Sequence, residues 1–248
     1  MLQRITRKIK RVAGRWGGRD LAAGLGAEER ALMTTLRAEG LTYLSEQKLA
    51  GLLNTCRAIE VAQLPGIFVE AGCALGGSAI LIASVKTGSR PFLVYDVFGM
   101  IPPPTKEDTK DVHERYQQIV AGKAVGLRGN TYYGYQDNLQ DLVQANLERF
   151  GIDCQEQNVA LIKGLVQDTM QIEQPVAFAH VDVDWYEPVL TCLQRVFPHL
   201  VLGGSIILDD YHDWGGCRKA TDEYLQGIAG QYALDDAAES LKITRVRR

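Results

Sequence analysis

Residues 67–78 have the sequence Ile-Phe-Val-Glu-Ala-Gly-Cys-Ala-Leu-Gly-Gly-Ser, a short apolar run followed by a glycine-rich turn. The apolar run predicts a buried strand, and the turn after it predicts the start of a helix. Gly72 lets the backbone turn sharply, and Gly76 with Gly77 lets it come close to a ligand. The spacing differs from the G-x-G-x-x-G dinucleotide fingerprint, which weakens the case for NAD. We therefore expect an α/β protein with a ligand site at this turn.

The same alternation of strand and helix continues through the rest of the chain. Strands are predicted at 67–71, 91–95, 159–163, 176–183, 204–209 and 240–246. A helix is predicted at 137–150, ended by Gly151. The alternation predicts a doubly wound, mostly parallel sheet with helices on both faces. Residues 98–134 fit neither period and predict a long excursion over the strand tips, of the kind that forms lids or binding loops.

Two pairs of aspartates follow two of these strands. Asp182 and Asp184 lie in HVDVDWYEP, and Asp209 and Asp210 lie in GGSIILDDYH. Strand ends meet at one edge of an open parallel sheet, and ligands bind at that edge. Four carboxylates there would repel one another without a cation, and hard oxygen ligands with no Cys or His cluster indicate Mg²⁺ or Mn²⁺. The competing interpretation is two unrelated solvated turns.

Acidic residues also end the two strands beside the glycine turn. Glu70 can accept hydrogen bonds from an ammonium group or a hydroxyl, and Asp96 ends the next strand, where an acidic residue typically binds the hydroxyls of a ribose. Together with the turn they favour S-adenosylmethionine, which carries a sulfonium and no phosphate. The simpler interpretation is an ordinary strand–helix unit with a tight turn.

Composition bounds the class of protein. The 248 residues are 46% hydrophobic, enough for one α/β domain with an appendage. No apolar run approaches the roughly 20 residues that cross a bilayer, and the N-terminus lacks the apolar region of a signal peptide. Five cysteines without C-x-x-C spacing fit a reducing compartment and argue against a disulfide framework or a zinc site. We expect a cytoplasmic location.

The charge is uneven along the chain. Residues 1–20 carry a net charge of +6, which leaves −9 for the rest of a chain whose total is −3. They predict a basic amphipathic helix, and residues 1–16 could contact an anionic membrane surface. The alternative, which we favour, is a helix docked on the domain or on a second subunit. No basic stripe with interleaved aromatics follows, so nucleic acid is not an expected partner.

Three parts are predicted along the chain. These are the basic helix at 1–20, a helical lid or appendage at 21–64, and the main domain at 65–248. Apolar helical faces before residue 64 make a homodimer the expected assembly.

Longer motifs carry a resemblance to a known family. The segments LTYLSEQKL, FVEAGCALGGSA, YDVFGMIPPP, HVDVDWYEP and DDYHDWGGCRKATDEY occur in this order between Leu41 and Leu225. In this respect the chain resembles the macrocin O-methyltransferase (TylF-type) family of metal-dependent sugar O-methyltransferases. The resemblance implies a class I methyltransferase (Rossmann-like) fold with seven strands, the last one antiparallel. The segment from Pro104 to Gly134 departs from the family, so the acceptor is not identified.

The resemblance also implies roles for individual residues. The expected cofactor-binding residues are Glu70, Gly72, Gly76, Gly77, Ser78, Asp96, Phe98 and Asp168, the last on the adenine side. Asp182, Asp209 and Asp210 are expected to hold Mg²⁺ (or Mn²⁺), and Asp184 is the expected base. The implied reaction moves a methyl group from S-adenosylmethionine to a hydroxyl of a sugar or glycosylated small molecule.

Three alternatives stay open from the sequence. The acceptor could be a catechol-like phenol, or a metal-dependent hydrolase or hydroxylase could use the same sheet edge. The third is a non-catalytic protein attached by the basic helix, for which four converging carboxylates would have no use. His212 is a competing base or ligand, although a lone His in a loop is more often a surface or packing residue. Burial is the expected use of Trp185, and His180 is expected to be structural.

Overall fold

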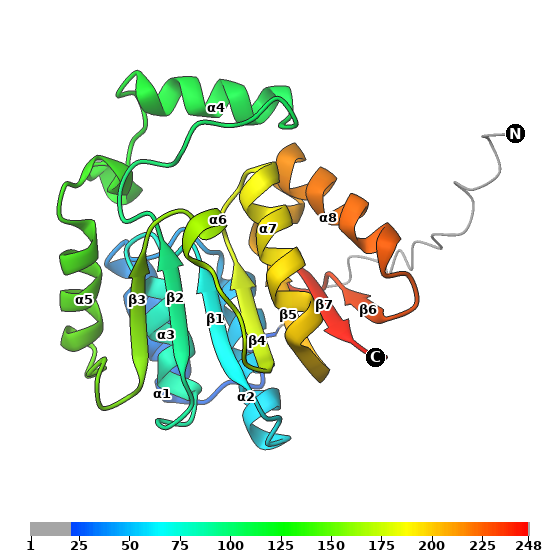
Figure 1. Ribbon diagram of the computed structural model, residues 1–248. Helices are drawn as coiled ribbons and strands as arrows, with labels where there is room; N and C mark the ends of the chain where they lie inside the picture. The colour runs from blue at the N-terminus through cyan, green and yellow to red at the C-terminus, as the bar shows by residue number, and fades with distance from the viewer. Residues whose placement is uncertain (1–20, 248) are drawn as a thin grey trace, which may run out of the picture.

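The computed structural model describes residues 21–247 and contains one seven-stranded sheet with the strand order β3-β2-β1-β4-β5-β7-β6 (Figure 1). The strands are β1 (Ile67–Ala71), β2 (Phe92–Asp96), β3 (Val159–Lys163), β4 (Val176–Val181), β5 (Leu200–Leu208), β6 (Tyr232–Asp235) and β7 (Leu241–Arg245). Strands β1 to β5 are parallel to one another, and β7 is antiparallel to both β5 and β6. The doubly wound sheet with an antiparallel last strand is therefore confirmed.

Several strand limits differ from the expected ones, and the largest differences are in β4 and β5. β4 ends at Val181 instead of 183, and β5 begins at Leu200 instead of 204. β6 was not expected at all. It is a four-residue strand at the edge of the sheet, and most of its side chains are exposed. A short exposed edge strand has no apolar run to reveal it.

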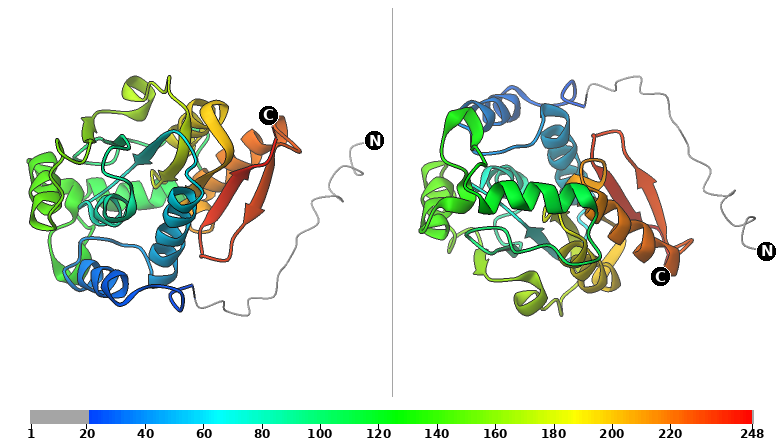
Figure 2. Two further views of the ribbon diagram at one scale, coloured as in Figure 1. Left: turned by 90° about the horizontal axis from the view of Figure 1, so that it is seen from below. Right: turned by 90° about the horizontal axis from the view of Figure 1, so that it is seen from above.

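Helices cover both faces of the sheet (Figure 2). They are α1 (Ala27–Ala38), α2 (Glu46–Val61), α3 (Gly77–Val85), α4 (Lys110–Val120), α5 (Leu139–Arg149), α6 (Val166–Thr169), α7 (Tyr186–Val196) and α8 (Gly215–Gly227). One hydrophobic cluster joins one face of the sheet to α1, α2, α3 and α5, and a second joins the other face to α6, α7 and α8. The predicted helix at 137–150 is confirmed as α5, and Gly151 follows it with φ +77°.

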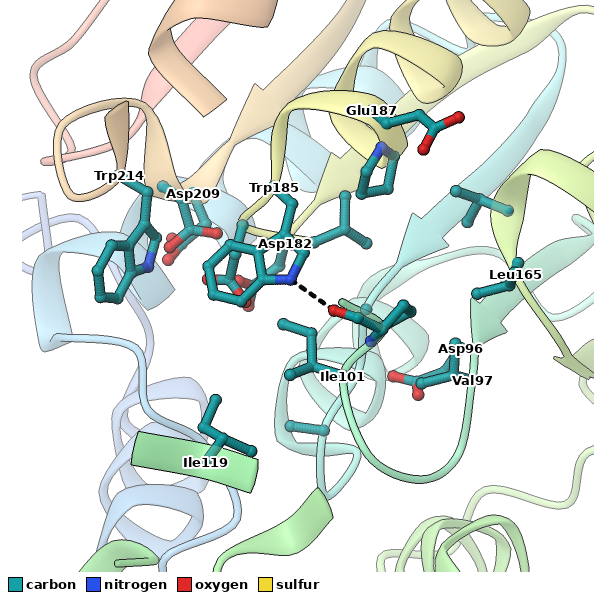
Figure 3. Close-up of a pocket in the computed structure, with 18 of the residues that line it drawn as sticks. Asp96, Val97, Ile101, Ile119, Leu165, Asp182, Trp185, Glu187, Asp209 and Trp214 are labelled. Carbon is teal, nitrogen blue, oxygen red and sulfur yellow. Dashed lines mark hydrogen bonds between the residues drawn. The ribbon is translucent and has the colours of Figure 1, made fainter. Parts of the chain in front are cut away.

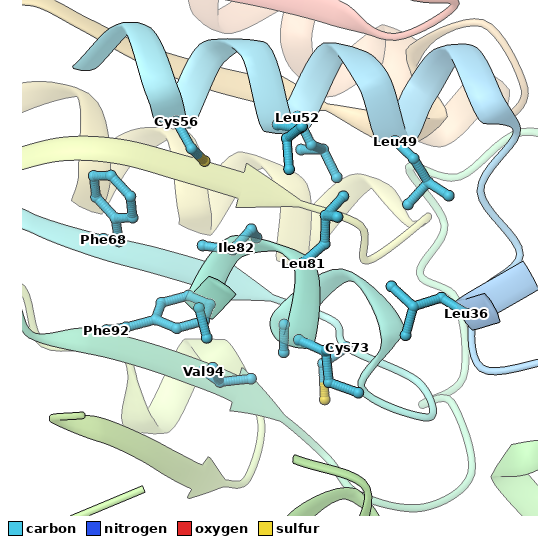
Figure 4. Close-up of a cluster of buried hydrophobic side chains, with 14 of the residues drawn as sticks. Leu36, Leu49, Leu52, Cys56, Phe68, Cys73, Leu81, Ile82, Phe92 and Val94 are labelled. Atoms are coloured by element: carbon cyan, nitrogen blue, oxygen red, sulfur yellow. The ribbon is translucent and has the colours of Figure 1, made fainter. Parts of the chain in front are cut away.

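Helix α2 packs directly on the sheet. Leu49, Leu52 and Cys56 are buried in the same cluster as Phe68 of β1 and Phe92 of β2 (Figure 4). Residues 21–64 were expected to be a lid or appendage, yet α2 shares its core with the main domain. The three-part division stays a prediction, and the basic helix expected at 1–20 lies outside the described residues.

Residues 98–134 contain a helix that the sequence analysis did not expect. Helix α4 lies across the edge of the sheet formed by the C-terminal ends of β1, β2 and β4 (Figures 1 and 2). Only Val112 and Ile119 of α4 are buried. Two buried positions among eleven residues produce a weak periodic signal, and the preceding prolines favour an irregular assignment. The predicted excursion over the strand tips is thus confirmed, whereas the prediction that it contains no regular structure is wrong.

Between Leu21 and Arg247 no helix combines the length and apolar character required to span a membrane.

Candidate active site

A cavity of about 580 Å³ opens at the carboxyl edge of the sheet (Figure 3). Its floor is formed by residues that directly follow β1, β2, β4 and β5, and α4 with the loop after β2 closes it from above. Asp96 and Leu165 lie at one end, and Asp182, Asp209 and Trp214 lie at the other. Gly72, whose backbone packs against that of Asp182, also lines the cavity. We refer to these ends as the glycine-turn half and the aspartate half.

The glycine-turn half depends on close backbone packing. Gly72 has φ +83°, and a Cβ atom there would lie 1.9 Å from the carbonyl oxygen of Asp182. Gly77 is close to Leu41, whose carbonyl oxygen would be 2.5 Å from a Cβ atom. Gly76 has φ +88° and faces Val143 of α5. Gly72 lines the cavity, whereas the space around Gly76 and Gly77 is filled by protein.

Asp96 lines the same half and is held by backbone groups. Its two carboxylate oxygens accept hydrogen bonds from the amides of Cys73 and Phe98, both at 2.7 Å. Phe98 is buried and has φ +46°, so the chain after β2 is bent sharply around the carboxylate. Burial raises the pKa of Asp96, and the backbone donors oppose this.

Glu70 does not line the cavity. It is fully buried on the face of the sheet covered by α2 and α3, and its Oε1 lies 2.8 Å from Nδ1 of His180 on β4. Although burial opposes it, the hydrogen bond and charge of Glu70 raise the pKa of His180. The sequence analysis treated His180 as a structural residue without a visible partner, and the structure supplies Glu70 as that partner.

The remaining expected cofactor residues are also placed by the structure. Ser78 is buried in the first turn of α3, and Asp168 is exposed on α6. Neither is among the cavity-lining residues, whereas Gln167, next to Asp168, is. The loop expected on the adenine side therefore reaches the cavity through Gln167. A sequence pattern that identifies the loop does not identify which of two adjacent side chains turns inward.

The aspartate half brings together carboxylates from two strand ends. Ligand oxygens of Asp182, Asp184 and Asp210 all lie within 4.8 Å of one another, and a second such group contains Asp209, Asp210 and Asp213. Asp184 has φ +56°, so the chain turns here and does not continue the strand that was expected to reach residue 183. The turn after Val181, not strand alternation, aims both side chains at Asp210.

Crowding raises the pKa of these carboxyls. Burial and the charge of Asp209 raise the pKa of Asp182 to about 8, and burial raises that of Asp184 to about 6. The pKa of Asp210 is raised well above its usual range by burial and by the charges of Asp184 and Asp182. Carboxylates that cannot all ionise together favour a bound cation.

Asp209 is held by its own partners. Its Oδ2 is 3.0 Å from Nζ of Lys48 on α2, and its Oδ1 accepts a hydrogen bond of 3.1 Å from Ser240. Lys48 also bonds Asp213 at 2.7 Å. Although burial opposes it, the charges of Asp209 and Asp213 raise the pKa of Lys48. The sequence analysis missed Lys48 because only the tertiary structure places α2 beside the end of β5.

The donor set fits a hard divalent cation. Oδ2 of Asp210 is buried and has no hydrogen-bond partner among the described residues. Asp210 is also the residue that the two aspartate groups share. An unpaired buried carboxylate oxygen is costly unless a cation or donor satisfies it. All-oxygen donors match Mg²⁺ or Mn²⁺ rather than zinc.

Aromatic side chains form the walls around the aspartates. Trp185 is 2% exposed, and its Nε1 donates a 2.9 Å hydrogen bond to the carbonyl oxygen of Pro102 (Figure 3). It packs edge-on against Trp214, with ring centroids 6.0 Å apart. Tyr132 and Tyr133 extend the wall below α4. The expected burial of Trp185 is correct, although its partners are Trp214 and the loop after β2.

His212 lies outside this constellation. It is half-buried, contacts the ring of Tyr211 and does not line the cavity. Its role as a competing base or ligand therefore has no support from the geometry.

Comparisons with known proteins agree with this architecture. A family model described as Macrocin-O-methyltransferase (TylF) matches residues 18–231. The chain is 26% identical over 211 residues to the 8-demethyl-8-(2,3-dimethoxy-alpha-L-rhamnosyl)-tetracenomycin-C 4'-O-methyltransferase of Streptomyces olivaceus, covering 83% of this chain and 74% of that protein.

Solved structures share the fold. The O-methyltransferase NovP superposes with a TM-score of 0.72 at 20% identity, covering 89% of this chain and 98% of that one. The methyltransferase PaMTH1 of Podospora anserina, solved with SAH bound, gives a TM-score of 0.55 at 15% identity, covering 92% of each chain.

Proposed function

Because the chain belongs to the macrocin-O-methyltransferase (TylF) family, we propose that it transfers a methyl group from S-adenosylmethionine to a hydroxyl of a sugar or glycosylated small molecule, with Mg²⁺ bound. Membership makes the chain an O-methyltransferase. This excludes the hydrolase or hydroxylase that the sequence left open. The tetracenomycin relative is named for transfer to a rhamnosyl group, which supports a sugar hydroxyl as the acceptor.

One observation carries the proposal. A single cavity contains the glycine turn with Asp96 at one end and the aspartate group at the other. A methyl donor in the first half and an acceptor hydroxyl in the second would meet in line within it. Such positioning removes much of the entropic barrier of a displacement reaction.

The glycine-turn half would bind the cofactor. The carboxylate of Asp96 would accept hydrogen bonds from the ribose hydroxyls, and Gly72 leaves room for the amino-acid end. Phe98 shapes this region through its backbone amide. Glu70, Gly76, Gly77 and Ser78 would support the turn from behind, because protein surrounds them.

The aspartate half would hold the cation through Asp182 and Asp210, whose oxygens lie in one group. Asp209, the third expected ligand, lies in a group with Asp210 but not with Asp182, and it would have to release Lys48 or Ser240 to bind the same cation. When bound, the cation lowers the pKa of an acceptor hydroxyl and stabilises the developing negative charge. Asp184 would accept the hydroxyl proton, since its carboxylate lies in the same group as Asp182 and Asp210. The aromatic walls would orient the sugar ring and exclude water.

Calorimetric titration with S-adenosylhomocysteine tests this proposal. We expect saturable binding near one site per chain, which Asp96→Ala weakens about tenfold or more. Glu148→Ala on the outer surface of α5 is the matched control and should bind as the wild type does. A folded protein that does not bind S-adenosylhomocysteine would contradict the cofactor assignment. The dimer and the cytoplasmic location stay predictions.

A further inference from the structure

One cation in the cavity has no carboxylate partner. Arg115 of α4 is half-buried and lines the cavity, with its guanidinium carbon 5.8 Å from the centroid of the Tyr132 ring. Among residues 21–247, no carboxylate oxygen lies within 4.0 Å of its nitrogens. Burial raises the pKa of Asp184 and of Tyr43, and the charge of Arg115 opposes both rises. Arg115 lines the same cavity as Asp184 and Tyr43.

The other cation that lines the cavity is already occupied. Lys48 directs its ammonium group to Asp209 and Asp213. A half-buried guanidinium without an anion loses hydration and gains little in return. Arg115 also keeps its fork of donors free, since its described contact is with the face of Tyr132. An anionic ligand would supply the missing partner.

A basic groove continues outward from the same place. Tyr43 lines both the cavity and a neighbouring hollow of about 530 Å³, whose charged residues are Arg30, Arg37, Arg128 and Glu46. We refer to this hollow as the arginine groove. Arg37 is 3.9 Å from Glu46, so the three arginines face a single carboxylate. This positive region stands out on a body whose residues after position 20 have a net charge of −9.

We propose that the acceptor is an anionic sugar derivative. Its phosphate or carboxylate binds Arg115 inside the cavity, and the rest of the molecule passes Tyr43 into the arginine groove. This rests on the proposed function and names the acceptor class for that site. Guanidinium forks match the oxygens of both anions in bidentate geometry. Several arginines in succession favour a phosphate or diphosphate, as in a nucleoside diphosphate sugar.

Binding of matched probes distinguishes the sources of the anion. The wild-type protein, saturated with S-adenosylhomocysteine and with Mg²⁺ in excess, is titrated with methyl glucoside, methyl glucuronide, glucose 1-phosphate and UDP-glucose. We expect the anionic probes to bind at least tenfold more tightly than methyl glucoside. Preference for the glucuronide identifies a carboxylate, and preference for the phosphates identifies a phosphoryl group. Equal binding of charged and neutral probes would overturn the proposal.

Variants locate the contact. Arg115→Ala should weaken binding of the preferred anionic probe by about 10- to 100-fold, the loss typical of a charge-assisted hydrogen-bonded pair. Arg115→Lys should restore part of it. Lys110→Ala removes an exposed cation from the same helix and should change nothing. Arg37→Ala should weaken UDP-glucose binding more than glucose 1-phosphate binding.

The outcomes separate this inference from the proposed function. Unchanged anion binding in Arg115→Ala means that the anion binds elsewhere, for instance on the cation, and this overturns the inference alone. Each variant is also titrated with S-adenosylhomocysteine, which reports an intact glycine-turn half. Failure of the wild type to bind S-adenosylhomocysteine would instead count against the methyltransferase assignment of the cavity.

Discussion

The two halves of the cavity are built in different ways. The glycine-turn half comes largely from two adjacent strand–loop units, and backbone groups make its key contacts, such as the amides of Cys73 and Phe98 that donate to the carboxylate of Asp96. The aspartate half combines side chains from α2, α4 and the ends of β4 and β5, which lie far apart in the sequence. The first half is constrained by steric fit, and the second by electrostatic balance.

Substitutions in the two halves should therefore affect different properties of the protein. A change in the glycine-turn half should act on folding and cofactor binding, because backbone atoms there have no space to move. A change in the aspartate half should act on cation binding and turnover, because its carboxylates are mutually repulsive. The following predictions test that separation.

The largest effect is expected at the aspartates. Asp210→Asn removes the carboxylate common to both aspartate groups, so we expect turnover to fall about 1000-fold or more, together with Mg²⁺ affinity. Asp184→Asn should lower turnover by about 100-fold or more and leave Mg²⁺ affinity nearly unchanged. Calorimetry with Mg²⁺ and a methyl-transfer assay measure the two quantities.

S-adenosylhomocysteine binding is the control for both aspartate variants, and it should stay at the wild-type level. Loss of Mg²⁺ affinity in Asp184→Asn as large as that in Asp210→Asn would show that Asp184 is a ligand, not the base.

Gly72 and Gly122 give a matched pair for the steric half. Both have positive φ, at +83° and +70°, but a Cβ atom would lie 1.9 Å from a carbonyl oxygen at Gly72 and meets nothing within 4 Å at Gly122. Gly72→Ala should lower the free energy of unfolding by about 3–5 kcal/mol, and Gly122→Ala by about 1 kcal/mol. Urea unfolding measures both. Similar losses would mean that φ alone, and not the contact with Asp182, is the constraint.

Removal of divalent cations should make stability depend on pH. The folded pKa values of Asp182 and Asp184 are raised to about 8 and about 6, from an ordinary value of 3.8. A raised carboxyl pKa means that the folded state binds more protons than the unfolded state, so stability falls as pH rises from about 4 to about 8. Together these two shifts correspond to a loss of about 5 kcal/mol in EDTA between pH 5 and pH 8.

Urea unfolding with EDTA and with Mg²⁺ measures this dependence. Added Mg²⁺ should reduce the slope, because cation binding competes with protonation. Asp182→Asn should reduce it in EDTA as well. An unchanged slope in that variant would assign the dependence to other groups.

The smallest effect is expected at the wall of the aspartate half. Trp185→Phe removes the 2.9 Å hydrogen bond to Pro102 and keeps an aromatic ring against Trp214, so stability should fall by about 1 kcal/mol. The KM for the acceptor should rise, while S-adenosylhomocysteine affinity stays constant. A comparable loss of S-adenosylhomocysteine affinity would show that the two halves are not independent.

Several features of the fold could be predicted because their signals are local. The apolar runs identified β1 to β5 and β7, and the position of Gly151 identified the end of α5. β6 and α4 escaped prediction because few of their side chains are buried, so no clear periodicity marks them.

The candidate site was predictable in part. The four aspartates were identified from two short motifs, and the structure brings three of them into one group. Lys48 and Arg115 were missed, since a charged residue on a helix carries no signal of which cavity it lines. Glu70 was assigned to the cofactor because it follows an apolar run, whereas its partner His180 lies 110 positions away.

The sequence by itself determined which segments form buried strands, where the glycine turn lies, which family the chain resembles and which strands end in carboxylates. Each of these depends on residues that are neighbours in the chain. Only the tertiary structure decided which side chains share the cavity. Alternation within a strand states which residues lie on one face, but it does not state what covers that face. The approach of α2 and α4 to the carboxyl edge placed Lys48 beside Asp209 and left Arg115 without an anion, and both follow from packing between distant segments.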